Sequence, residues 1–120
     1  MKIAVTATGK TLDSPLDQRF GRAARFIVWD SESATYEVLD NTQNLNAQQG
    51  AGIQTAGNVV RSGAHVLISG HLGPKAFQVL NAAGIEMYCA DVATVNDALE
   101  AYAAKRLEAI VAPTVEGHWI

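Results

Sequence analysis

The sequence predicts an α/β domain with a mixed five-stranded sheet and helices on both faces, in the order β-β-β-α-β-α-β-α. Three observations support this prediction. Two strand-like runs, 25–30 and 35–39, are separated by one short turn, which favours an antiparallel hairpin. The run His65–Ser69 is apolar at its centre, as is typical of a buried parallel strand. Glycine and proline mark the ends of the helical segments that follow.

The first half of the chain consists of strands joined by polar loops. The expected elements are strands at Lys2–Ala7, Arg25–Asp30 and Thr35–Leu39, a tight turn at Ser31–Ala34, and loops at Thr8–Ala23 and Asp40–Gly50. Each strand is a short apolar run, and the loops are polar.

The second half alternates helices with strands. The expected elements are a helix at 52–62 closed by Gly63, a strand at 65–69, a helix from Pro74 to Gly84, a strand at 85–89, and a helix at 95–105. Thr94 and Asp97 are spaced as in a capping box. The helix faces predicted to be buried carry Ile53, Ala56 and Val60, then Phe77, Leu80 and Ala83, then Leu99 and Tyr102. Residues 107–120 fit either a short strand or a docked extension.

Length and composition limit the class of protein. A chain of 120 residues, 48% hydrophobic and 18% charged, indicates one globular domain over residues 1–120. A net charge of −3 argues against wrapping nucleic acid. The single cysteine, Cys89, excludes an intramolecular disulfide and fits a reducing compartment. No apolar run is long enough to span a membrane, so we expect a cytoplasmic protein without a membrane partner.

The most informative loop carries Arg19, Arg22 and Arg25 around Phe20 and Gly21. Planar guanidinium donors, a glycine backbone that a ligand can approach and an apolar wall suit a bulky anion. Lys10 is the other local positive charge. A solvated basic loop is the plain alternative.

Two glycine-rich segments also precede helices, Gly50-Ala51-Gly52 and Gly70-His71-Leu72-Gly73-Pro74. Free N–H groups at a helix start favour anions. Right-handed crossovers would make strands one, four and five parallel, and ligands bind beyond the carboxyl ends of such strands. We therefore expect these segments to converge with the arginine loop, with His71 exposed there.

Three other chemistries are poorly supported. A phosphate-binding P-loop needs glycine where Ala4 stands, and a dinucleotide site needs glycine where Thr55 stands. A metal-dependent nuclease of the kind considered below needs a carboxylate within Lys2–Ala7, which has none. The loop carboxylates that could hold magnesium are Asp13, Asp17, Asp40 and Asp91. For Cys89 a buried apolar role is favoured over a soft metal ligand.

Four segments together resemble the dinitrogenase iron–molybdenum cofactor biosynthesis family, from Met1 to about Lys105. They are Asp17-x-Arg-Phe-Gly-Arg-Ala23, Asn41 to Asn44, Gly50-Ala-Gly52, and Gly70-x-x-Gly-Pro-x-Ala76. The resemblance implies a ribonuclease-H-like fold. It also implies a carrier or chaperone for iron–molybdenum cofactor or its precursors. Small stand-alone members include a protein that holds a molybdenum–copper sulfide cluster without covalent attachment. Some members act beside ATPases of the Mrp/MinD type.

The resemblance therefore implies a non-enzymatic carrier of a preassembled, anionic, molybdenum-containing metal–sulfur cluster. One cysteine cannot build a four-cysteine iron–sulfur site, so charge, hydrogen bonds and shape must hold the cluster. The predicted binding residues are Lys10, Arg19, Phe20, Gly21, Arg22, Asn41, Gly50, Gly52, Gly70, His71, Leu72 and Gly73. Phe20 and Leu72 would supply apolar walls, His71 is the candidate for a direct metal ligand, and Cys89 is a weaker candidate. The alternatives are a protein-interaction or regulatory module that partners such an ATPase and, less favoured, the nuclease.

Overall fold

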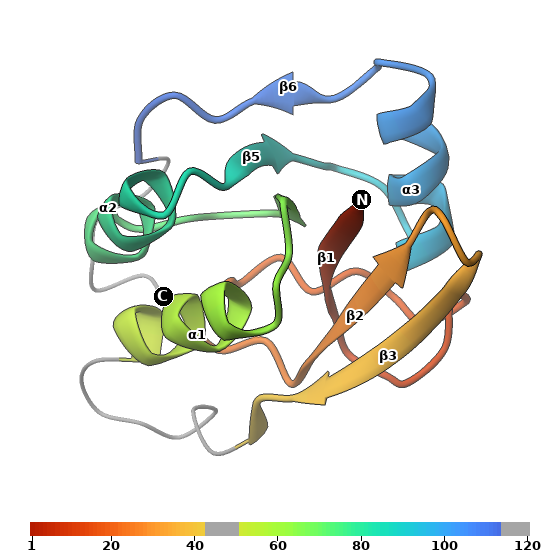
Figure 1. The fold of residues 1–120 in the computed structure, drawn as a ribbon, viewed down its shortest axis with the longest axis horizontal. Coiled ribbons are helices and arrows are strands. Elements are labelled where there is room, and N and C mark those ends of the chain that lie inside the picture. The colour runs from red at the N-terminus through yellow and green to blue at the C-terminus, as the bar shows by residue number, and fades with distance from the viewer. Residues whose placement is uncertain (43–50, 114–120) are drawn as a thin grey trace.

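The computed structural model describes residues 1–42 and 51–113. Figure 1 shows the elements in chain order. They are β1 Lys2–Ala7, β2 Arg25–Asp30, β3 Thr35–Asp40, α1 Ala51–Arg61, β4 Val66–Ser69, α2 Pro74–Ala82, β5 Glu86–Cys89, α3 Val95–Ala103 and β6 Glu108–Ala109. The strands and helices expected from the sequence are confirmed, with ends that shift by one or two residues.

The strands form one mixed sheet in the order β3-β2-β1-β4-β5-β6. β2 pairs antiparallel with β3, which confirms the predicted hairpin, and β1 pairs antiparallel with β2. β1, β4 and β5 are parallel to one another. Their carboxyl ends therefore meet at one edge of the sheet, where ligands of open α/β sheets bind.

The prediction of five strands was wrong by one. β6 pairs antiparallel with β5 through Tyr88 opposite Ala109 and Cys89 opposite Glu108. A strand of two residues has no alternation of apolar and polar positions from which it could be recognised.

Helices cover both faces of the sheet, as predicted. Figure 1 shows α1 and α2 side by side on one side of the sheet and α3 on the other. One core cluster joins α1 and α2 to the sheet through Ala56, Val59 and Leu80. A second cluster joins α3 to the opposite face through Val95 and Ala98.

The buried face of α1 agrees with the prediction at Ala56 and differs from it at Ile53 and Val60. Ile53 and Val60 are 44% and 38% exposed, and the buried residues are Ala51, Gly52, Thr55, Ala56 and Val59. α1 packs beside α2 as well as on the sheet, and small side chains allow that close approach. The two large apolar residues, Ile53 and Val60, therefore indicated a face that is rotated away from the buried one. Ala83 is likewise exposed, because it caps the end of α2.

The predicted helix ends depend on local backbone geometry. Gly63 and Gly84 have φ of 81° and 76°, the left-handed conformation that glycine adopts readily. The Thr94 side chain accepts a hydrogen bond from the Asp97 N–H at 3.1 Å, which confirms the predicted cap. α3 ends before the expected Lys105, which has a φ of 59° and leaves the helical conformation.

Candidate functional site

The long loop between β1 and β2 divides into two parts. The first part docks on the start of α3: the Leu16 N–H donates to the Ala93 carbonyl (3.1 Å), and the Val95 N–H to the Ser14 carbonyl (3.0 Å). The second part, residues 17–23, turns toward the ends of β1 and β4. Only this second part approaches the segment 70–73.

Backbone hydrogen bonds join the arginine loop to the loop after β4. The His71 N–H donates to the Gln18 carbonyl (2.7 Å), and the Phe20 N–H donates to the His71 carbonyl (3.3 Å). Arg19 and His71 thereby form a parallel bridge, and both residues are exposed. We call residues 17–22 and 70–73 the arginine–histidine corner. The convergence of these segments, expected from topology, is what the structure shows.

Two glycines allow the loops to approach closely. A Cβ on Gly70 would lie 2.5 Å from the Gln18 carbonyl oxygen and 2.7 Å from the Gln18 Cα. A Cβ on Gly21 would lie 3.0 Å from the Gly52 nitrogen. The arginine loop therefore rests directly on the start of α1. At the start of α2, by contrast, no side chain forms a capping hydrogen bond, because the N-cap residue is Gly73.

A buried polar network fixes the arginine loop to α1. The Asn41 amide donates to the Ala23 carbonyl (2.8 Å) and to Thr55 Oγ1 (3.1 Å). Thr55 Oγ1 donates to the Gly21 carbonyl (3.0 Å). Asn41, a predicted binding residue, is fully buried and positions the loop. The sequence analysis gave Thr55 no role in the site. The signal that could have indicated its role is a threonine among the small residues of α1.

Asp17 orients Arg19. Its carboxylate accepts the Arg19 N–H at 3.0 Å and lies 3.6 Å from the Arg19 Nε. Asp17 is buried, whereas the Arg19 side chain is 56% exposed. The guanidinium is therefore anchored at its inner side and open to solvent at its outer side.

The structure corrects the role predicted for two apolar residues. Phe20 and Leu72 are both fully buried in the core cluster beneath α1 and α2. Phe20 packs edge-on against Phe26, with ring centroids 5.6 Å apart. The backbone pairing between the loops turns both side chains into the core. They cannot form walls for a ligand in this conformation and instead support the corner from below.

The other predicted residues fall in different places. Arg22 is half-buried within the corner, and Gly50 lies outside the described residues. Lys10 is exposed in the first part of the loop. The pKa of Asp40 is lowered mainly by a hydrogen bond from the Thr42 N–H, and the positive charges of Arg25 and Lys10 lower it further. No described contact joins Lys10 to the corner.

Cys89 lies at the end of β5, beside the corner. Its Sγ–H donates to the Gly70 carbonyl at 3.6 Å, and the residue is half-buried. Burial raises the pKa of the thiol, and the negative charges of Glu108 and Asp91 raise it further. These surroundings favour the neutral thiol, and the two carboxylates would repel an anion.

We expect Cys89 alkylation to follow this raised pKa. The rate of reaction with iodoacetamide should rise with pH through a midpoint above the ordinary thiol pKa of 9.0, because only the thiolate reacts. Glu108→Gln should move the midpoint toward the ordinary value by removing one carboxylate. A midpoint at or below that value in the unmodified protein would contradict the described surroundings of the thiol.

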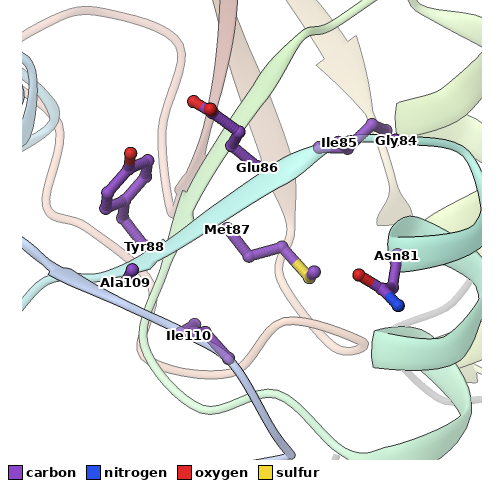
Figure 2. Close-up of a pocket in the computed structure, with 8 residues that line it drawn as sticks. All are labelled: Asn81, Gly84, Ile85, Glu86, Met87, Tyr88, Ala109 and Ile110. Atoms are coloured by element: carbon purple, nitrogen blue, oxygen red, sulfur yellow. The ribbon is translucent and has the colours of Figure 1, made fainter.

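One pocket lies away from the corner. It has a volume of about 330 Å³ and is lined by Asn81, Gly84, Ile85, Glu86, Met87, Tyr88, Ala109 and Ile110. Figure 2 shows Met87 pointing from β5 toward Asn81 at the end of α2. The pocket lies between the end of α2, β5 and the residues of β6, whereas the corner lies at the carboxyl ends of β4 and β5. We assign it no role in binding.

Two features are absent from residues 1–42 and 51–113. These residues contain no group of three or more His, Cys, Asp or Glu side chains that could hold a metal ion. Among the same residues, no helix is long and apolar enough to cross a membrane.

The fold and this site define a small mixed α/β protein with a basic, glycine-lined corner at the carboxyl ends of its parallel strands. The chain belongs to the family described as dinitrogenase iron-molybdenum cofactor, which matches residues 1–105. The family resemblance expected from the four sequence segments is confirmed.

Solved structures of similar proteins share the fold. The apo form of the orange protein from Desulfovibrio gigas is 41% identical, with a TM-score of 0.91 over 95% of this chain and 96% of that one. The Thermotoga protein TM1290 is 37% identical, with a TM-score of 0.85 over 97% and 98% of the two chains. In sequence, the chain is also similar to the uncharacterized protein MJ0580 of Methanocaldococcus jannaschii, with 29% identity over 111 residues, 90% of each chain.

Proposed function

We propose that this protein is a non-enzymatic carrier of a preassembled, anionic metal–sulfur cluster that contains molybdenum. The cluster, called the cargo below, would bind at the arginine–histidine corner. The observation that supports this most directly is the backbone bridge between Arg19 and His71, which sets these two exposed residues next to each other at the edge where open α/β sheets bind ligands. Membership of the dinitrogenase iron-molybdenum cofactor family and likeness to the orange protein support the same proposal.

In this proposal Arg19 and Arg22 supply most of the charge. A guanidinium is planar and weakly hydrated, so it suits the soft sulfide surface of such a cluster. The start of α2 contributes backbone N–H groups and the positive end of the helix dipole. Gly21 and Gly70 let the loops close around a shared surface. Lys10 stays a prediction: it is exposed, and no described contact joins it to the corner.

Binding without covalent attachment is consistent with the side chains at the corner. Cys89 is kept as a neutral thiol by burial and by Glu108 and Asp91, so it is a poor ligand for an anionic cluster. His71 is exposed at the corner and is our proposed candidate for direct contact with metal. The Mrp/MinD-type ATPase partner remains a prediction that no described contact tests.

Titration with tetrathiomolybdate tests the proposal. We expect the anion to bind the purified protein, to raise its melting temperature, and to bind more weakly as salt screens the arginines. Molybdate, an oxyanion of the same charge, should bind at least about tenfold more weakly, because its oxygens are more strongly hydrated and cost more free energy to desolvate. Equal binding of the two anions, or no binding of tetrathiomolybdate at millimolar concentration, would refute the proposal.

The same titration with His71→Ala separates two roles for the imidazole. Direct ligation predicts that the visible absorption bands of the bound anion move in the variant. A purely electrostatic role predicts unchanged band positions and lower occupancy at the same anion concentration.

A further inference from the structure

Ser69, the last residue of β4, is fully buried, and its hydroxyl has no hydrogen-bond partner. Within residues 1–42 and 51–113 it is the one buried side-chain nitrogen or oxygen in this condition. A buried hydroxyl without a partner destabilises a protein, so such groups are rare and call for an explanation. No described contact supplies one.

The position of Ser69 places it directly beneath the corner. It pairs in parallel register with Cys89 on β5. On its other side the register pairs Ile68 with Val5, so the next step brings Ser69 beside Thr6 of β1. Thr6, Ser69 and Cys89 therefore form a row of three short polar side chains. The row crosses the carboxyl ends of the three parallel strands, on the side of the sheet that carries α1 and α2.

The two outer members of the row are bonded to the corner. Thr6 Oγ1 donates to the Asp17 carbonyl at 2.7 Å, and Cys89 Sγ donates to the Gly70 carbonyl at 3.6 Å. Asp17 and Gly70 each begin one of the two segments that make up the corner. Only the middle hydroxyl, on Ser69, has no acceptor. The Ser69 hydroxyl is therefore a hydrogen-bond donor without an acceptor, and it lies next to the loops that carry Arg19 and His71.

We infer that the Ser69 hydroxyl is an inner hydrogen-bond donor to the sulfide surface of the anionic cargo, an inference that rests on the proposed carrier function. Because the hydroxyl is sealed in the empty protein, the cargo reaches it only when the segment 70–73 shifts. Two backbone hydrogen bonds tie that segment to residues 18–20, so both parts of the corner move together. Cargo binding then gives the hydroxyl the partner that it lacks.

Ser69→Ala tests the inference because it predicts effects of opposite sign. In the empty protein the melting temperature should stay the same or rise, since the substitution removes an unsatisfied polar atom. The affinity for tetrathiomolybdate should fall about tenfold or more, the size typical of a lost hydrogen bond to a charged group. A structural defect would lower both quantities together.

Thr6→Val is the matched control. It removes a hydroxyl from the same row, but one that already has a partner, so it should lower the melting temperature of the empty protein. If wild-type protein binds the anion and Ser69→Ala binds it equally well, the inference is wrong and the carrier function stands. If Ser69→Ala clearly lowers the melting temperature, the hydroxyl already has a partner such as water, which also overturns the inference. If wild-type protein does not bind, both fail.

Discussion

Replacement of both Arg19 and Arg22 with alanine is expected to weaken tetrathiomolybdate binding by about 100-fold. A charge-assisted hydrogen bond contributes about 1.5 to 3 kcal/mol, and we take the lower value for each arginine. The lower value is appropriate because Asp17 already interacts with the Arg19 guanidinium at 3.6 Å. The dissociation constant, measured by titration at fixed ionic strength, checks the expectation.

The double variant Arg25→Ala, Arg61→Ala is the matched control, since it removes the same net charge from other places. Arg25 Nη1 donates to the Thr8 carbonyl at 3.2 Å, away from the corner, and Arg61 ends α1. This control should lose only a few-fold in affinity, through longer-range interactions that salt screens. An equal loss in both double variants would show that net charge, and not the corner, governs binding.

Gly70→Ala is expected to lower both stability and binding. The new Cβ would meet two backbone atoms of Gln18, at 2.5 Å and 2.7 Å, and neither can rotate away as a side chain could. Overpacking of this kind costs about 1–3 kcal/mol or more. The two loops would be forced apart, which breaks the hydrogen bond from the His71 N–H to the Gln18 carbonyl. Thermal unfolding and anion titration measure the two losses.

Gly57→Ala is the control for this substitution. Gly57 lies within α1, where the nearest atom to a new Cβ is the flexible Arg61 guanidinium at 3.2 Å. Alanine is favoured over glycine inside a helix by about 0.5–1 kcal/mol, so this variant should be as stable as the wild type or more stable. If Gly70→Ala resembles Gly57→Ala in both measurements, the close contact between the loops does not exist in solution.

The sequence predicted most of the fold because its signals are local. Ser31–Ala34 is too short to join anything but neighbouring antiparallel strands, and Gly63, Pro74 and Gly84 each mark a helix end. The exposed side of α1 could not be predicted in the same way. The small residues of α1 face inward because α2 packs beside this helix. The spacing of apolar residues within α1 carries no information about this contact with α2.

The convergence of the two loops at the corner was predicted from the sequence, but the direction in which some of their side chains point was not. The rule that parallel strands end at one edge is enough to bring Arg19 and His71 together. Whether Phe20 or Leu72 faces outward depends on hydrogen bonds between distant loops, and no pattern within either loop encodes them. The unsatisfied hydroxyl of Ser69 is invisible in sequence for the same reason, since it is defined by what surrounds it.

The bonds between residues 18–20 and residue 71 also constrain the order of folding. A contact between such distant segments forms only after the crossover through α1 has brought β4 beside β1, and closing that loop costs chain entropy. A nascent chain that has not yet emerged beyond β4 has no corner at all. If the protein carries a cluster as proposed, the cluster should bind only to a chain that has folded at least this far, and the bound protein should unfold more slowly than the unbound one.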